Sequence, residues 1–303
     1  HQLSAAQLRN DIAQPSVREW LKPVHLDDVS EFISLLVCDK QTLDLRSRSA
    51  ALHTDDNMLL EFAAPRSLYV QKKPFRSSSF MPAPERVFDP LALTDSERAP
   101  FLHSLDLAVG ARESFRHAYE GPGEPREHQR VALKLSPYQF WASEQAKVAA
   151  PTETRTAEEA RYLEEARTRL QSQAEALWRQ GNDIEAVYAF RWRAAMDPQE
   201  LESQCKLAEK LIDAANNHAK SNQALALELL HQGRRVGTQI LVKWPESTKG
   251  TEFVCRSLLA LGEISQSGRF FRSEAEKLYK RLMTRFDGDV SKLPPDLVKS
   301  MGM

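Results

Sequence analysis

Two short clusters of histidine and aspartate are the first candidates for chemistry in this chain. Each cluster joins one histidine to two aspartates: His25, Asp27 and Asp28, then His53, Asp55 and Asp56. Imidazole and carboxylate groups bind metal ions and transfer protons. Both clusters fall at expected helix starts or turns, where aspartate accepts backbone hydrogen bonds without any metal. The sequence therefore favours a capping role for these aspartates, and it predicts no metal site and no cofactor.

The motifs of the common enzyme classes are missing from the sequence. The chain has eleven glycines, and none has the spacing of a phosphate-binding loop. There is no His-Glu-x-x-His, no paired cysteine motif and no nucleophile elbow. We therefore expect a protein without catalytic activity. The alternative is an enzyme with an unrecognised site, which would require clustered ionisable groups with shifted pKa values in a pocket.

Composition limits the class of protein. The chain has 303 residues, of which 42% are hydrophobic, so it is long enough for two domains with a buried core. Its 41 basic and 42 acidic residues give a formal net charge of -1, which argues against a dedicated nucleic-acid binder, including a helical-repeat RNA binder. The longest apolar run, 32–38, is far shorter than the roughly 20 residues that a membrane-spanning helix needs.

The three cysteines do not form a disulfide framework. Cys38, Cys205 and Cys255 are isolated from one another, and each lies in an apolar stretch with helical periodicity. A reduced thiol in a hydrophobic core is the prediction for all three.

The range 174–198 carries the strongest structural signal. It is typical of a helix, a Gly-Asn-Asp turn at 181–183, a second helix and a stop at Pro198. The apolar faces of such a helical hairpin cannot both be buried within the hairpin itself. The pattern therefore predicts neighbouring hairpins and favours protein binding over catalysis.

Six positions of this hairpin match a known family. They are a small residue, an aliphatic residue, a turn glycine, a second small residue, an aromatic residue and a proline: Ala174, Leu177, Gly181, Ala186, Phe190 and Pro198. The pattern resembles the tetratricopeptide repeat (TPR), a helical hairpin of about 34 residues. The resemblance covers 167–198. Gln173 and Arg193 depart from it, because the family usually has Leu and a small residue there.

Two more helical pairs follow along the chain. Apolar residues recur at helical spacing over 201–215 and 223–241, and a third pair begins near Phe253 and ends at Gly288. We therefore expect a mainly α-helical protein whose residues 151–288 form a TPR-like α-α solenoid of about three hairpins. Residues 289–303 are expected to form a C-terminal tail.

The amino-terminal half is expected to be built differently. Residues 1–64 are predicted to form a helical segment with a helix near 25–37. The range 65–150 is rich in proline, which disfavours helix at the preceding residue, so we expect a partly extended arm there. Helices are predicted within it at 101–119 and 137–149.

The extended part of this arm carries widely spaced aromatic residues: Tyr69, Phe75, Phe80 and Phe88. Apolar anchors on an extended chain suit a strap that lies on another protein. A long loop that crosses its own domain is an equal alternative.

A second set of candidate contact residues lies on the first helix of the TPR-like hairpin. Its expected groove-facing residues include Gln171, Glu175, Trp178 and Arg179. Some members of the family hold a partner's carboxyl terminus with Lys and Asn at such positions, whereas Glu175 would repel a carboxylate. Trp178 is either a contact anchor for a partner or, as we favour, a packing residue between successive hairpins.

These patterns predict a non-catalytic scaffold subunit of a larger assembly, which binds other protein subunits through its helical stack and its arm. The chain begins at His1, as it would after loss of a targeting peptide or after trimming. On that ground we expect an accessory subunit of a mitochondrial complex, such as the respiratory chain or ATP synthase, associated with a membrane only through partners. The alternative is a cytoplasmic adaptor that binds peptides transiently.

Overall fold

The computed structural model describes residues 5–21, Val29, Ile33, 91–120, 125–135 and 157–300. Val29 and Ile33 are helical and buried, in the segment expected to be helical. Several predictions lie outside the described residues: the helix at 137–149, both His-Asp clusters, Cys38, and the arm residues Tyr69, Phe75, Phe80 and Phe88.

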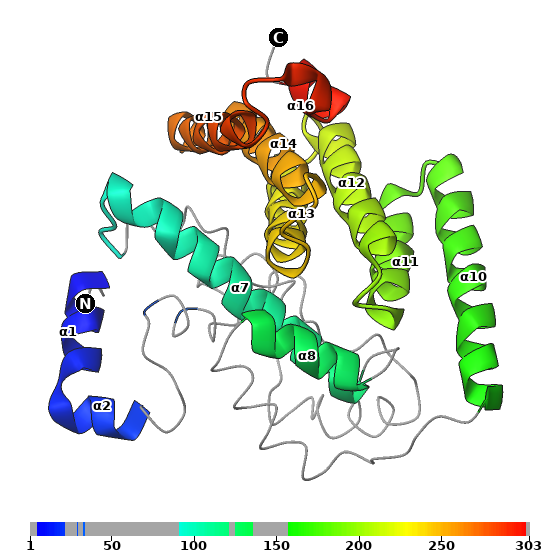
Figure 1. The fold of residues 1–303 in the computed structure, drawn as a ribbon, viewed down its shortest axis with the longest axis horizontal. Coiled ribbons are helices and arrows are strands. Elements are labelled where there is room, and N and C mark those ends of the chain that lie inside the picture. Colours follow the sequence, from blue (N-terminus) through cyan, green and yellow to red (C-terminus); the bar gives the residue numbers. More distant parts are fainter. Residues whose placement is uncertain are drawn as a thin grey trace, which may run out of the picture.

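The described part of the chain is helical, as predicted, and contains eleven α-helices and no strand (Figure 1). The amino-terminal helices are α1 (Ala5–Ala13), α2 (Pro15–Leu21), α7 (Asp95–Glu120) and α8 (Pro125–Leu135). The carboxyl-terminal helices are α10 (Ala157–Arg179), α11 (Asp183–Met196), α12 (Leu201–His218), α13 (Gln223–Lys243), α14 (Lys249–Ile264), α15 (Gly268–Arg285) and α16 (Pro295–Ser300). None of these helices is long and apolar enough to cross a membrane.

Residues 157–285 form three consecutive helical hairpins, α10–α11, α12–α13 and α14–α15. Each helix packs against the next one along the chain, and α12 also contacts α14. The first hairpin turns at Gly181, whose φ of 78° is left-handed, as the sequence predicts. The N–H of Gly181 donates to the carbonyl of Trp178, and the N–H of Asn182 donates to that of Leu177. These two bonds end α10 as a Schellman motif, which satisfies its last carbonyl groups.

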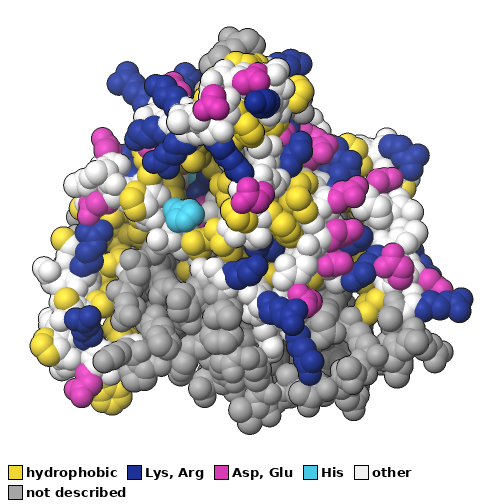
Figure 2. Space-filling view, in the orientation of Figure 1, with side chains coloured by type: hydrophobic (Ala, Val, Ile, Leu, Met, Phe, Trp, Pro, Cys, Tyr) yellow, Lys and Arg dark blue, Asp and Glu magenta, His cyan; other side chains and the backbone are white. Residues whose placement is uncertain are grey.

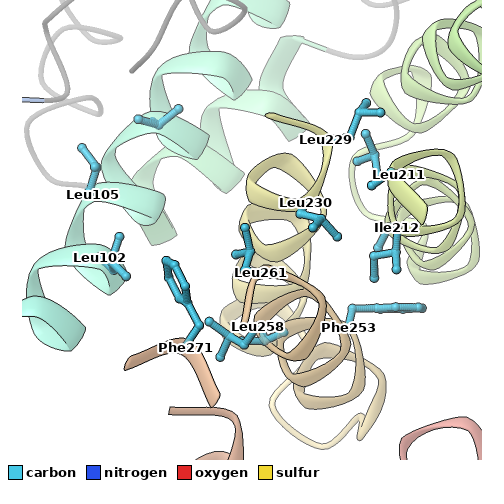
Figure 3. Close-up of a cluster of buried hydrophobic side chains, with 14 of the residues drawn as sticks. Leu102, Leu105, Leu211, Ile212, Leu229, Leu230, Phe253, Leu258, Leu261 and Phe271 are labelled. Atoms are coloured by element: carbon cyan, nitrogen blue, oxygen red, sulfur yellow. The ribbon is translucent and has the colours of Figure 1, made fainter. Parts of the chain in front are cut away.

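The hairpins share one hydrophobic core. Figure 3 shows Leu211 and Ile212 of α12 facing Leu229 and Leu230 of α13. Two glycines bring α13 and α14 close together: a Cβ on Gly250 would lie 2.7 Å from the backbone N of Leu241, and one on Gly237 would lie 3.0 Å from that of Val254. No side chain fits at either crossing without a shift of backbone.

The α7–α8 hairpin packs against the stack through α13. Leu102 of α7 lies beside Phe271 of α15 (Figure 3), and Leu105 of α7 and Leu261 of α14 belong to the same buried cluster. A buried ion pair joins Asp106 of α7 to Arg234 of α13, and both side chains are at most 4% exposed. The hairpin is therefore held by apolar contacts and by one buried charge pair.

Helix α7 starts earlier than predicted, at Asp95 rather than at residue 101. Thr94 caps it: the Thr94 hydroxyl and backbone N–H both donate to Glu97, at 2.7 and 3.0 Å. Pro100 lies inside the helix. The contact of Glu97 with the Thr94 N–H is one half of a capping box, and it fixes the start of α7 ahead of the proline, whose missing N–H costs the helix one hydrogen bond.

The range 289–303, expected as a tail, contains α16, which packs on α14. Leu293 and Leu297 are buried in a second cluster with Cys255, Tyr279 and Leu282. This segment covers the last hairpin of the stack.

Candidate functional site

The clearest candidate site is a groove along the first helices of the three hairpins. Helices α10, α12 and α14 line one hollow of ≈ 630 Å³. Each helix contributes two or more side chains, including Gln171, Glu175, Lys206, Glu209, Lys249 and Phe253. We call this surface the groove. It exists because the second helix of each hairpin packs behind the first, so that the three first helices turn the same way (Figure 1).

Charged side chains of both signs line the groove. Figure 2 shows acidic and basic side chains intermingled over this face, toward the right of the view. Arg193 pairs with Glu200 at 2.7 Å, and Lys249 pairs with Glu252 at 2.9 Å. Arg193 is one of the two residues that depart from the TPR pattern, and its side chain lines the groove.

A second hollow of ≈ 560 Å³ continues from the groove along α12 and α14. The two share Glu209, Lys249 and Phe253, and the second one reaches Lys299 on α16. The concave surface is therefore longer than a single hairpin and ends at the short carboxyl-terminal helix.

The contact residues expected on α10 are split between two environments. Gln171 and Glu175 line the groove with Thr168, and the Gln171 amide donates to the Glu175 carboxylate at 2.6 Å. Trp178 and Arg179 are not among the groove residues. Arg179 is exposed, and its Nε donates to the backbone carbonyl of Glu175 at 3.3 Å.

Trp178 instead contacts the next hairpin. The Nζ of Lys210 on α12 lies 4.2 Å from the centre of the Trp178 ring, at a distance suited to a cation–π interaction. The ring also packs on the shared core. This geometry agrees with the packing role that the sequence analysis favoured for Trp178.

Sequence reasoning missed the groove residues of α12 and α14. Glu202, Lys206 and Glu209 recur at spacings of four and three, so they lie on one side of α12. Such a polar stripe is ordinary on a solvated helix, so it indicates a groove only once the three helices are placed together.

A second candidate is a pocket of ≈ 80 Å³ between the α7–α8 hairpin and the stack. Its lining comes from five of the described helices and includes Glu113, Ser114, His128, Arg191, Arg235 and Lys243. We call it the polar pocket. Its residues are far apart in sequence, and no motif could have identified them.

Burial shifts two of the pocket's charged groups. Burial and, to a smaller extent, the nearby Lys134 lower the pKa of Lys243 to about 7, while Asp197 acts in the opposite direction. Burial also lowers the pKa of the Arg191 guanidinium, and Glu113 opposes that shift. A guanidinium still stays charged at neutral pH.

The described residues bring together no group of three or more His, Cys, Asp or Glu side chains that would hold a metal ion. Comparison with protein-family models, with curated proteins and with solved structures finds no match for this chain.

Proposed function

We propose that this chain is a protein-binding scaffold with a TPR-like helical stack, and that its groove holds an extended segment of a partner protein. The observation that carries the proposal is the single hollow that runs across α10, α12 and α14. Stacked helical hairpins use such concave surfaces to bind partners, because every hairpin adds contacts along one line.

The composition of the groove indicates the kind of segment it would hold. Glu175 and Glu202 on one part of the surface and Lys206 on another offer pairing to charges of both signs. Phe253 is 3% exposed, so it provides little apolar surface to a partner. We therefore expect a polar segment with both acidic and basic residues, whose association weakens at high salt.

We further propose that the partner belongs to a stable assembly in which this chain is a non-catalytic subunit. The second hollow and α16 extend the surface beyond one hairpin, which suits a partner that remains bound. The strap role of the arm and the mitochondrial setting stay predictions from the sequence. A transient adaptor is the alternative, and it predicts a monodisperse monomer that binds peptides reversibly.

The test exchanges two charges in the groove without changing the net charge. The variant Glu175→Lys/Lys206→Glu is compared with Glu276→Lys/Lys280→Glu, a matched exchange between exposed residues of α15. Both full-length proteins are used for affinity purification from cells at moderate salt. We expect the groove variant to lose partners that the wild type and the α15 variant retain.

Photocrosslinking places those partners on the surface. A photoreactive residue at position 171 should crosslink to one segment of the partner, whereas one at position 280 should not. Recovery of the same partners with the groove variant, or of the single chain alone with the wild type, contradicts the proposal.

A further inference from the structure

The polar pocket brings more positive than negative charge into a buried place. Arg191, Arg235 and Lys243 line it together with only one carboxylate among the described residues, Glu113. The lining therefore carries an excess of two positive charges when Lys243 is protonated and the histidines are neutral, and of one when Lys243 is neutral. Charge of one sign in a desolvated pocket is costly unless an opposite charge accompanies it.

Arg235 is one of the positively charged groups of this pocket. Its side chain is buried, at 7% exposure, and the described residues offer its guanidinium no hydrogen bond and no ion pair. Asp106 attracts Arg235 only from a distance, because both carboxylate oxygens already accept hydrogen bonds from Arg234. Arg191 lies close enough to repel it. The N–H donors of the Arg235 guanidinium thus face the pocket, which Arg235 lines.

Several other polar groups of the lining suit the same ligand, beside apolar residues such as Leu207 and Val236. Arg191 is held by Gln232, which accepts a hydrogen bond from its guanidinium. Ser114 and Gln239 add neutral polar groups on the α7 and α13 sides of the pocket. Guanidinium, ammonium, hydroxyl and amide groups are the donors that bind oxyanions in proteins.

We propose that the polar pocket binds a tetrahedral oxyanion, a phosphate or sulfate group, with Arg235 as its central ligand and Arg191 and Lys243 at its sides. The bound anion bridges α7, α11 and α13, and so fastens the α7–α8 hairpin to the stack. This role is separate from the groove, which lies on the first helices of the hairpins.

The size of the pocket agrees with this ligand. Its ≈ 80 Å³ is about half the volume of a cavity of about 150 Å³ that holds benzene. One tetrahedral oxyanion fits such a space, whereas a nucleotide does not. The oxyanion is either a free ion or the head group of a small organic phosphate.

Thermal unfolding of the full-length protein tests the proposal. Sodium sulfate and sodium phosphate are titrated at constant ionic strength, and the midpoint is followed for the wild type, Arg235→Gln and Arg281→Gln. Arg281 is an exposed arginine of α15 and serves as the matched control. Because sulfate and phosphate also stabilise proteins by exclusion from their surface, the specific effect is the saturable difference between proteins.

We expect the midpoint of the wild type and of Arg281→Gln to rise saturably with either anion, and that of Arg235→Gln to lack the saturable part. Calorimetric titration should show binding at least about ten-fold weaker in Arg235→Gln, the loss of one charge-assisted hydrogen bond. Lys243→Met provides a second variant with the same expectation if Arg235→Gln does not fold.

Two further outcomes decide the matter. Tighter binding of glycerol phosphate than of inorganic phosphate identifies the ligand as an organic phosphate, and equal or weaker binding identifies a free anion. Equal responses of the wild type and Arg235→Gln to both anions, or no calorimetric binding by the wild type, overturn the proposal.

Discussion

Replacement of Asp106 by alanine should lower the free energy of unfolding by about 3–5 kcal/mol, the cost of leaving a buried charge without its partner. The Arg234 side chain is 4% exposed and that of Asp106 is 1% exposed, so water cannot take the place of the missing carboxylate. Arg234 donates from both terminal nitrogens to the two carboxylate oxygens, and the Nη2–Oδ1 distance is 3.1 Å. Both bonds disappear in the variant.

A double replacement separates the charge from the packing. In Asp106→Leu/Arg234→Met, neither side chain carries a charge, and apolar atoms fill the space that the ion pair occupies between α7 and α13. Such replacements of a buried ion pair are neutral or stabilising by about 1–4 kcal/mol. We therefore expect the double variant to be at least as stable as the wild type, although Asp106→Ala alone is strongly destabilised.

Urea denaturation at pH 7 measures these differences as shifts in the midpoint, provided that the slope with denaturant is unchanged. The exposed pair between Arg161 and Glu165 on α10 is the control, since its side chains are 82% and 57% exposed. Glu165→Ala should cost no more than about 0.3–0.5 kcal/mol. A loss of less than about 1 kcal/mol in Asp106→Ala is what an exposed ion pair would give. That result would refute the burial of this pair and the docking of α7 on α13.

Three other predictions test the packing and the buried ionisable groups. Gly250→Ala should destabilise the protein by about 1–3 kcal/mol, because the new Cβ would meet the backbone N of Leu241 at 2.7 Å; an unchanged urea midpoint would contradict this crossing. Burial lowers the pKa of Lys243 to about 7 from an ordinary value of 10.5, so the unfolded chain binds the extra proton between these pH values. Relative to Lys243→Met, the free energy of unfolding of the wild type should therefore be lowest below pH 7 and should increase as pH rises toward 10. A difference in urea midpoint between the two proteins that does not change with pH would refute the burial of the amine. Burial also raises the pKa of Cys255 to about 12, so alkylation at pH 8, read by mass spectrometry of peptides, should leave Cys255 unmodified until the protein unfolds. Labelling of native and unfolded Cys255 at equal rates would show that the α14–α16 cluster is open.

The carboxyl-terminal hairpins could be predicted because local signals and periodicity agree there. Gly181 and the following Asn182 mark a turn that the backbone makes with left-handed geometry, and the buried Ala186 and Phe190 fall on the face expected to pack. Such agreement between turn chemistry and apolar spacing makes a helix pair readable from one sequence.

The α7–α8 hairpin and the polar pocket could not be predicted in the same way. Asp106 and Arg234 are 128 residues apart, and nothing local indicates that they meet. The start of α7 did have a local signal, the capping box from Thr94 to Glu97, but the helix was expected to begin at residue 101, in a range predicted to be partly extended. Contacts between distant helices are set by packing, on which single-residue patterns give no information.

The adjacency of Arg234 and Arg235 restricts how α13 tolerates changes in length. Arg234 pairs with the carboxylate of Asp106 on α7, and Arg235 lines the polar pocket. Consecutive residues of an α-helix differ by about 100° around its axis, since a turn takes about 3.6 residues. Insertion of a single residue early in α13 would therefore rotate both arginines away from their places at once. An insertion in the connection at 244–248 would leave them in position. The length of α13 before Arg234 is therefore constrained by two separate contacts, whereas the length of the connection is not.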